Sequence, residues 1–311
     1  MKRLQNRIAE SGALLPVSAF YALAVWLLTG LLTGGAWPQL ACYVAAVYLL
    51  VELSTGNALL RVRSRMVSCT FIFLSCMTPG LFSSLSGVIT LLCWVIAILI
   101  LFSAYQDNQA VGRTFYAFAF LGGASIAFIQ SLWLIPVLWI LMATQLQMLG
   151  VRTFFASIIG LLAPYWFFAL WFIYIRDFTP LLDHLAGLWT IDSTPDILSL
   201  PVGHVCAFLL TTAMSLSGII HFWLRSFEDK IRIRLLHGFF FVMTLLLLVL
   251  AVLQPQHFGT LMLLAYLFAS PLVAHYLTFT STRLTNILFF VVLSLAVLIM
   301  ALNLWMPSLH F

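Results

Sequence analysis

Charged side chains are scarce in this sequence. Only 7% of its 311 residues are Asp, Glu, Lys or Arg, whereas soluble domains contain roughly 25%. The hydrophobic share is 63% and the mean hydropathy is +1.11. A soluble globule with this composition would lack a hydrated surface, so water-soluble enzymes and nucleic-acid-binding proteins are excluded. The natural solvent for most of the surface is a lipid bilayer.

Cysteine pairs with metal-ligand spacing are also missing. All five cysteines lie within apolar runs, and no two of them have the spacing of a zinc site. We therefore interpret them as small buried apolar residues, and we predict neither a metal site nor a cofactor. The five are Cys42, Cys69, Cys76, Cys93 and Cys206.

Apolar runs are present along the whole chain, and most have the roughly 20 residues that a helix needs to cross a hydrocarbon core of ~30 Å. They predict an all-α fold, a polytopic integral membrane helical bundle of about 11 transmembrane helices that forms a single transmembrane domain over residues 1–311. The runs occupy residues 14–33, 38–54, 66–79, 82–103, 114–129, 131–149, 154–175, 202–224, 235–253, 258–278 and 286–305.

Two stretches, 66–103 and 114–149, are too long for one crossing and slightly short for two. The first contains the turn-forming sequence CMTPGLF (76–82), and the second contains AFIQSLW (127–133). We predict that each stretch is a tight hairpin of short or tilted helices. Re-entrant half-helices are the alternative for both.

Basic residues are nearly absent from one side of this topology. When loops alternate between sides, thirteen of the fourteen Lys and Arg residues fall on one side, and Arg176 alone falls on the other. Because basic loops stay in the cytoplasm, the N-terminus is predicted inside, and the C-terminus and the segment 176–201 are predicted outside. Membrane orientation thus explains the net charge of +5.

Ionisable residues are scarce within the predicted spans. Glu52 lies near the inner end of its span, where we expect it to be paired at the interface. His204, His221, His237 and His275 lie within about a turn of a span end. This pattern disfavours an ion-coupled transporter and leaves a passive or lipid-handling role. The small residues at 122–125 and 211–218 are interpreted as helix-packing surfaces, with a polar substrate path as the alternative.

The outer segment 176–201 contains four of the nine acidic residues. Thr179-Pro180 predicts a helix start with Thr179 as the cap, followed by leucines and Trp189 on one face. A second start is predicted at STPD (193–196). We expect this segment to lie on the outer membrane interface.

Two sets of candidate site residues follow from this topology. On the outer side, a general base or acid would come from six residues, although solvated loop residues are the simpler interpretation. On the inner side, six basic residues would bind lipid headgroups or phosphate, although membrane topology alone also explains them. The outer set is Asp177, Asp183, His184, Asp192, Asp196 and His204, and the inner set is Arg61, Arg63, Arg65, Lys230, Arg232 and Arg234.

The stretch from AYQDNQAVGRTF to GLLAPYWF (104–167) carries a resemblance. Its order of a polar Gln/Arg turn, a Gly-rich span, an aromatic-Pro span, an Arg turn and then GLLAPY resembles a family of uncharacterised polytopic inner-membrane proteins associated with Bacteroidetes. The hairpins followed by FLGGASIAFIQSLWLIPVLWIL are also similar to the hydrophobic core of GT-C glycosyltransferases and O-antigen polymerases. This resemblance implies an enzyme that handles polyprenyl-phosphate-linked sugars.

The chain departs from these enzymes on its outer side. GT-C enzymes carry a catalytic acid in the first outer loop, but that loop is GGAW (34–37) here. Polymerases use arginines of a large outer loop, whereas this outer side has only Arg176. Any catalytic acids would therefore come from residues 177–196.

These patterns predict a multi-pass protein of the bacterial cytoplasmic (inner) membrane. The leading hypothesis is a component of envelope glycan or lipid assembly on a glycosyltransferase-like scaffold. Its partners would be membrane lipids and a polyprenyl-phosphate-linked substrate. The alternatives are a non-catalytic scaffold that binds protein partners in an envelope complex, and a transporter that is not coupled to ions.

Overall fold

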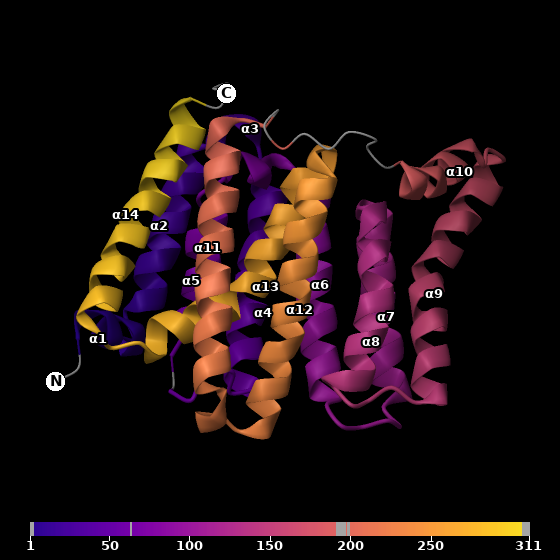
Figure 1. The fold of residues 1–311 in the computed structure, drawn as a ribbon. Helices are drawn as coiled ribbons and strands as arrows, with labels where there is room; N and C mark the ends of the chain where they lie inside the picture. The colour runs from indigo at the N-terminus through magenta and orange to yellow at the C-terminus, as the bar shows by residue number, and fades with distance from the viewer. Residues whose placement is uncertain (1–2, 63, 191–196, 198–199, 307–311) are drawn as a thin grey trace. The chain divides into compact units, whose positions relative to one another are not determined.

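The computed structural model describes residues 3–62, 64–190, 197 and 200–306. Within these residues every regular element is a helix, which confirms the all-α prediction. The chain forms two compact units of helices (Figure 1): unit 1 combines Met1–Ser84 with Thr194–Phe311, and unit 2 is Leu85–Ser193. A single domain over residues 1–311 stays a prediction.

Seven helices in the described part of the chain are long and apolar enough to cross a membrane. An eighth span results if α1 (Leu4–Glu10) and α2 (Leu14–Leu28), which are bent by 87°, count as one. These helices indicate a membrane protein, while eleven spans and the orientation stay predictions. The seven are α4 (Trp37–Gly56), α6 (Leu85–Ser103), α9 (Val151–Ile175), α11 (Val202–Arg225, continued by η5, Ser226–Glu228), α12 (Ile231–Leu253), α13 (Phe258–Phe279, preceded by η6, Pro255–His257) and α14 (Arg283–Trp305).

The remaining apolar runs form shorter helices. These are α3 (Leu31–Gly34), α5 (Met66–Ser75), α7 (Val111–Ala127) and α8 (Ile135–Thr144). Both predicted breaks are confirmed, because α5 ends at Ser75 before η1 (Pro79–Ser83), and α7 ends at Ala127 before η2 (Ile129–Leu134). The ten residues of α5 cover about 15 Å, which is half of a hydrocarbon core.

The broken segment formed by α5 and η1 reaches both ends of α4. At one end, Arg65 lines a pocket together with Thr55 from the last turn of α4. At the other end, the Ser83 carbonyl accepts a hydrogen bond of 3.4 Å from Gln39 Nε2 near the start of α4. A helix of 20 residues is about 30 Å long. The geometry therefore favours a broken traverse of unit 1 over a re-entrant half-helix.

Helix α13 forms the centre of unit 1. Every residue from Leu261 to Ala274 is buried, as expected for a helix that is apolar all round. Helices α5, α11 and α12 pack around it. Gly218 of α11 approaches α13 so closely that a Cβ atom there would lie 2.7 Å from the Leu272 carbonyl oxygen. This contact supports the packing interpretation of residues 211–218.

Close helix packing also organises unit 2. A Cβ atom at Gly160 of α9 would overlap the Phe115 carbonyl oxygen of α7, and one at Gly122 would overlap the Leu161 carbonyl oxygen. Within the small residues at 122–125, Gly122 thus serves the packing of α7 against α9. The second half of α9 is mostly exposed and rich in aromatic residues, including Trp166, Phe167, Trp171 and Tyr174.

The predicted amphipathic helix after Arg176 is present as α10 (Thr179–Ala186), which lies at an angle to α9 (Figure 1). Its leucines Leu182 and Leu185 are exposed, as expected for an interfacial helix whose apolar face meets lipid. The prediction that Thr179 caps the helix is wrong. Thr179 is the first helical residue, and its N–H donates to Asp177 Oδ1 over 3.0 Å. The Asp177 carboxylate can reach this N–H because residues 177 and 178 lie in the non-helical connection between α9 and α10.

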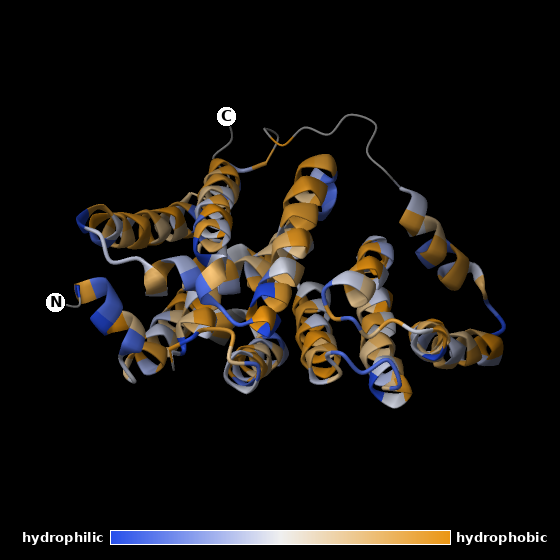
Figure 2. Cartoon of the chain, turned by 60° about the horizontal axis from the view of Figure 1, so that its bottom comes forward, coloured by the Kyte–Doolittle hydropathy of each residue, from blue (hydrophilic) through white to orange (hydrophobic). Residues whose placement is uncertain are grey.

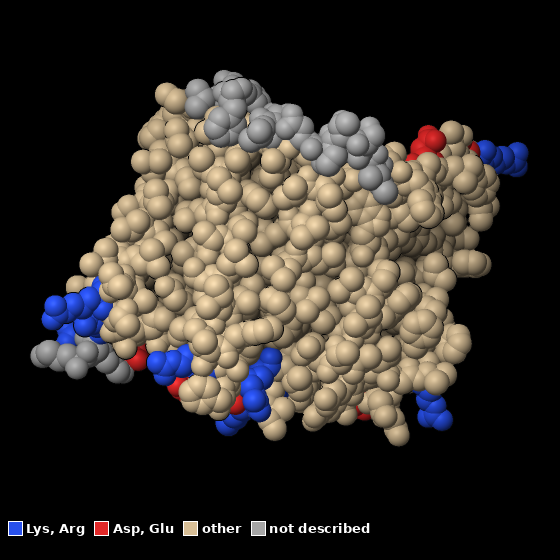
Figure 3. Space-filling model, viewed as in Figure 1, with Lys and Arg blue, Asp and Glu red and all other residues tan. Residues whose placement is uncertain are grey.

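The charges of unit 1 gather at one end of its helices. At this end α4, α11 and α13 finish, and α5, α12 and α14 begin. We call it the basic end, defined by Arg61, Arg65, Arg225, Arg232 and Arg283. Figure 2 shows hydrophilic residues at α1 and at the helix connections, and in Figure 3 the charged side chains of unit 1 lie along its lower edge, with an uncharged surface above them. This distribution is typical of helices that cross a hydrocarbon layer.

Candidate functional site

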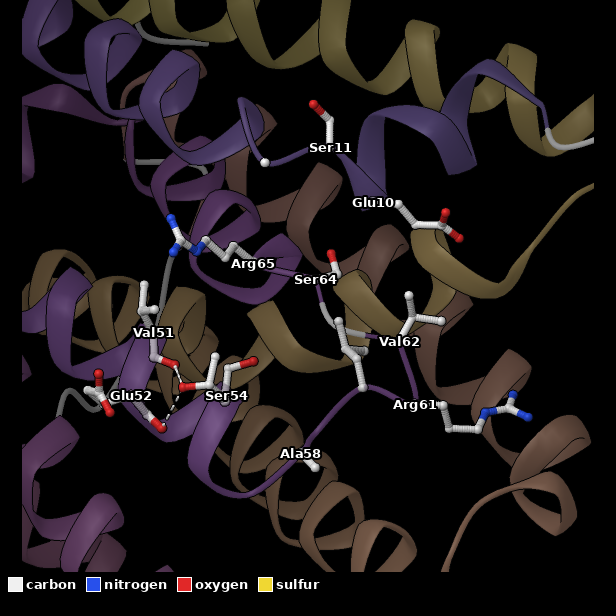
Figure 4. Close-up of a pocket in the computed structure, with 13 residues that line it drawn as sticks. Glu10, Ser11, Val51, Glu52, Ser54, Ala58, Arg61, Val62, Ser64 and Arg65 are labelled. Atoms are coloured by element: carbon white, nitrogen blue, oxygen red, sulfur yellow. Dashed lines mark hydrogen bonds between the residues drawn. The ribbon is translucent and has the colours of Figure 1, made fainter.

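A pocket of about 900 Å³ lies at the basic end of unit 1. Three segments line it: the turn between α1 and α2 (10–12), the last turns of α4 (51–55), and the loop 58–65. Figure 4 shows Glu52 and Arg65 on one side of this pocket, and Glu10 and Arg61 on the other. We call it the basic-end pocket. It combines guanidinium, carboxylate and hydroxyl groups around one cavity.

The loop after α4 is fixed by its own backbone and by buried leucines. Ala58 has a φ of 48°, in the left-handed region, and turns the chain so that the Leu59 N–H donates to the Ser54 carbonyl over 3.1 Å. Leu59 and Leu60 are then buried. Further along, the Ser64 hydroxyl donates to the Ala9 carbonyl. The two arginines of the pocket therefore project from an anchored loop.

Arg61 is committed to two carboxylates of the α11–α12 connection. Its Nη1 lies 2.8 Å from Glu228 Oε2, and its Nε lies 2.8 Å from Asp229 Oδ1. Its guanidinium carbon also lies 4.4 Å from the centroid of the Phe279 ring. A planar guanidinium can pair with carboxylates and stack on an aromatic face at the same time. Arg61 thereby ties the α4–α5 loop to α11, α12 and α13.

Asp229 is the buried member of this network. Its side chain has no exposed surface, and its Oδ2 lies 3.2 Å from Nε2 of the buried His275. Burial raises the pKa of the Asp229 carboxyl above its ordinary value, and the neighbouring Arg61 charge opposes this shift. The cost of burial thus exceeds the benefit of the ion pair. The carboxylate is oriented by one guanidinium and one imidazole.

Three histidine rings gather next to Asp229. The ring centroid of His275 lies 5.2 Å from that of His237 and 5.5 Å from that of His221. His237 Nδ1 lies 3.0 Å from the Ile233 carbonyl oxygen, so this nitrogen carries the proton. In the described part of the chain, His237 Nε2 and His275 Nδ1 are buried and have no hydrogen-bond partner. The rings form a packed imidazole cluster beneath the Arg61–Asp229 pair.

This arrangement is suited to binding an anionic headgroup. Arg65 is exposed at the pocket, and arginine can donate two parallel hydrogen bonds to a phosphate. Glu10 and Glu52 add acceptors for hydroxyl or amine groups, and Ser54 and Thr55 add hydroxyls. Among the residues that the structure describes, no three His, Cys, Asp or Glu side chains converge as metal ligands. The chemistry present is hydrogen bonding and ion pairing.

The predicted inner residues divide into three groups. Arg61 and Arg65 line the basic-end pocket. Arg232 donates from Nη2 to Asn57 Oδ1 over 2.8 Å, beside the end of α4. Lys230 and Arg234 are exposed at the same end, while Arg63 lies outside the described residues. Glu52, expected to be paired at the interface, lines the basic-end pocket and forms no ion pair within the described residues, while Arg61 pairs with Glu228 and Asp229.

The predicted outer residues that the structure describes make separate contacts within their own units. Asp177 and Asp183 are exposed, and the Thr179 N–H lowers the pKa of the Asp177 carboxyl by donating to it. His184 turns into unit 2, where its Nε2 lies 3.2 Å from the Ser125 carbonyl oxygen. His204 belongs to unit 1 and packs near Phe258. Asp192 and Asp196 lie outside the described residues, as does the predicted helix start at 193–196.

Sequence reasoning missed Asp229 and its partners. The alternating topology already places the ends of α11 and α13 and the start of α12 on one side. It therefore places His221, His237 and His275 near the acidic pair at 228–229. Spacing along the chain could not reveal the pairing, because Asp229 and His275 are 46 residues apart.

No protein-family model, no curated protein and no solved structure matches this chain. The resemblances to the Bacteroidetes membrane family and to GT-C glycosyltransferases therefore stay predictions.

Proposed function

We propose that this protein binds the phosphate-bearing headgroup of a membrane lipid at its basic end, as a component of envelope lipid or glycan assembly. The observation that carries this proposal is the basic-end pocket, which the exposed Arg65 lines together with two carboxylates and several hydroxyls. A phosphate suits the guanidinium, and hydroxyls of a linked glycerol or sugar suit the carboxylates. A polyprenyl-phosphate-linked substrate combines these groups.

The topology belongs to the same proposal. We infer eleven crossings, with the N-terminus in the cytoplasm and the C-terminus outside, in a bacterial inner membrane. All eleven apolar runs are helical in the described residues, and the basic residues of unit 1 gather at one end, which supports this topology. The basic-end pocket would then open at the cytoplasmic interface. A phosphorylated lipid made on that side could enter it directly.

Binding can be tested with the full-length protein in nanodiscs and with two short probes, farnesyl phosphate and farnesol. The two share a chain, so their difference reports the phosphate alone. We expect Arg65→Gln to weaken farnesyl phosphate binding by about ten- to a hundredfold, the loss of one charge-assisted hydrogen-bonding partner. Arg152→Gln at the start of α9 is the matched control and should bind normally. Equal affinity of the Arg65 variant and the wild type would refute the site.

A second candidate function is a non-catalytic scaffold that binds a membrane partner. The exposed aromatic face of α9 favours it, because Trp166 and Trp171 are more than half exposed at 69% and 59%. Aromatic residues are enriched where protein surfaces meet. Replacing both tryptophans by leucine keeps an apolar face for lipid but removes the aromatic contacts. If α9 binds a partner, native gels of solubilised membranes should show a smaller complex for this variant.

A further inference from the structure

A second cavity of unit 1 differs from the basic-end pocket in shape and chemistry. It has a volume of about 390 Å³ and is lined by apolar groups of α1, α2, α5, α11, α13 and α14. Tyr21, Phe73, Met214, Phe289, Leu293 and Ala296 are among its lining residues, and we call it the α2–α14 slot. Its volume lies within the range of roughly 300–1,000 Å³ that ligand pockets occupy.

The slot has the depth of one membrane leaflet. Along α14 it extends from Phe289 to Val297, a rise of about 12 Å. One leaflet contributes about half of the ~30 Å hydrocarbon core. The slot starts close to the basic end, because Ile8 of α1 and Met66, the first residue of α5, also line it. Its side is formed by exposed residues of α2 and α14, such as Val17 and Leu293, so its neighbouring solvent is lipid.

Helix α1 lies at the basic end of the slot, where Ile8 lines it. It turns by 87° from α2 and is hydrogen-bonded across the α13–α14 connection. The Gln5 N–H donates to Asn286 Oδ1 over 3.1 Å, and Arg3 Nε donates to the Ser281 carbonyl over 2.8 Å. Ile8 lies one turn after Gln5 and faces the slot. A ligand in the slot would therefore have its polar end beside α1.

The charges around α1 favour the binding of an anionic headgroup. Arg3 and Arg7 lie on or before α1, and Arg283 begins α14, while Glu10 is the one acidic residue of α1. Three guanidinium groups against one carboxylate leave a positive field at the membrane interface. The slot is apolar, has the depth of one leaflet and lies next to a positive interface. These properties suit a phospholipid with a net negative headgroup, whose acyl chain would lie in the cavity.

We propose that the α2–α14 slot holds one acyl chain of an anionic phospholipid, whose phosphate lies against the arginines of α1 and α14. This site is separate from the basic-end pocket and does not depend on it. The bound chain replaces empty space between α14 and the body of unit 1, so it should stabilise the packing of α14.

Native mass spectrometry of the full-length protein tests this site, after exchange into phosphatidylglycerol or phosphatidylcholine of matched chains. The wild type should retain one phosphatidylglycerol. Ala296→Phe fills the slot and should lower that retention about tenfold, whereas Leu295→Phe, on an exposed neighbouring position, should not. Arg7→Gln should reduce the preference for phosphatidylglycerol about fivefold, as expected for the loss of one basic residue at a membrane surface. Arg152→Gln at the start of α9 should leave retention unchanged, because Arg152 lines neither the slot nor the basic-end pocket.

A second measurement does not depend on any variant. Phosphatidylglycerol with a diazirine in the middle of its chain should crosslink the wild-type protein within 289–297 of α14 or within 69–74 of α5. Equal retention by the Ala296 and Leu295 variants, or crosslinks confined to other helices, would refute the chain site. Equal retention of the two lipids by the wild type would refute the anionic headgroup.

Discussion

Loss of the Asp229 carboxylate should destabilise unit 1 far more than loss of Glu228, although both groups contact the same guanidinium. The Asp229 side chain is fully buried, whereas the side chains of Arg61 and Glu228 are 28% and 32% exposed. Asp229→Ala would leave His275 Nε2 without its acceptor and Arg61 without its buried partner. Breaking one side of a buried pair costs about 3–5 kcal/mol. An exposed pair contributes little.

Thermal unfolding in detergent can measure this difference. Cys69 and Cys76 are buried in the native protein, so a thiol-reactive dye reports their exposure on unfolding. For a unit of about 200 residues, the expected loss corresponds to a fall in Tm of roughly 6–20 °C. Asp229→Asn keeps the shape of the side chain without its charge, so it separates the effect of the charge from the effect of losing the side chain. Glu228→Gln is the matched control and should change Tm little.

Two results would contradict this reasoning. If Asp229→Ala and Glu228→Gln lowered Tm equally, then the burial of Asp229 would not make its ion pair with Arg61 more important for stability than that of Glu228. If Arg61→Gln and Asp229→Asn had strictly additive effects on unfolding, then the two side chains would not interact, because contacting residues show coupling energies of about 0.5–3 kcal/mol.

Three further predictions concern pH, packing and the membrane interface. Burial raises the pKa of Asp229, so the stability from its protonation is complete below the ordinary value of 3.8 and is lost as pH rises through the raised value. Tm measured across mildly acidic pH should show this slope, and Asp229→Asn should abolish it. Gly122→Ala should destabilise the protein by about 1–3 kcal/mol through overpacking, whereas Gly123→Ala, with open space around its Cβ position, should not. In a cysteine-free background, a spin label at Leu182 should collide with lipid-dissolved oxygen more often than one at Asp183. Equal collision rates would argue against an interfacial α10.

Much of the fold could be predicted from hydropathy because the bilayer imposes one simple requirement on each span. The eleven apolar runs all contain helices, and the chain breaks at the Thr-Pro-Gly sequence 78–80, where α5 has ended and η1 begins at Pro79. The length of α5 could not be predicted in the same way. Met66–Ser75 is buried almost completely by the helices around it, so its hydropathy reflects protein packing as much as lipid.

Capping and pairing were less predictable than helix positions, because they depend on single side-chain orientations. Thr179 and Asp177 are both residue types that favour the N-cap, but Phe178 is the N-cap of α10, and the Asp177 carboxylate accepts the Thr179 N–H from one residue further back. The partners of Arg61 come from a hairpin more than 160 residues away. No local pattern could have selected Glu228 and Asp229 from the nine acidic residues.

The pairing of Arg61 also changes which arginine can serve a ligand. The predicted membrane orientation would by itself place positive charge at the basic end, so a count of arginines cannot distinguish a binding residue from a topological one. The structure supplies a distinction, because the Arg61 guanidinium already faces two carboxylates and an aromatic ring. A phosphate that recruited Arg61 would have to leave Asp229 buried without its counter-charge, which costs free energy. Arg65 is exposed at the same pocket and faces no such cost, since in the described part of the chain no carboxylate lies within ion-pair distance of it. Arg65 is therefore the guanidinium through which this pocket would bind phosphate, and Arg61 is the residue that holds the pocket loop in place.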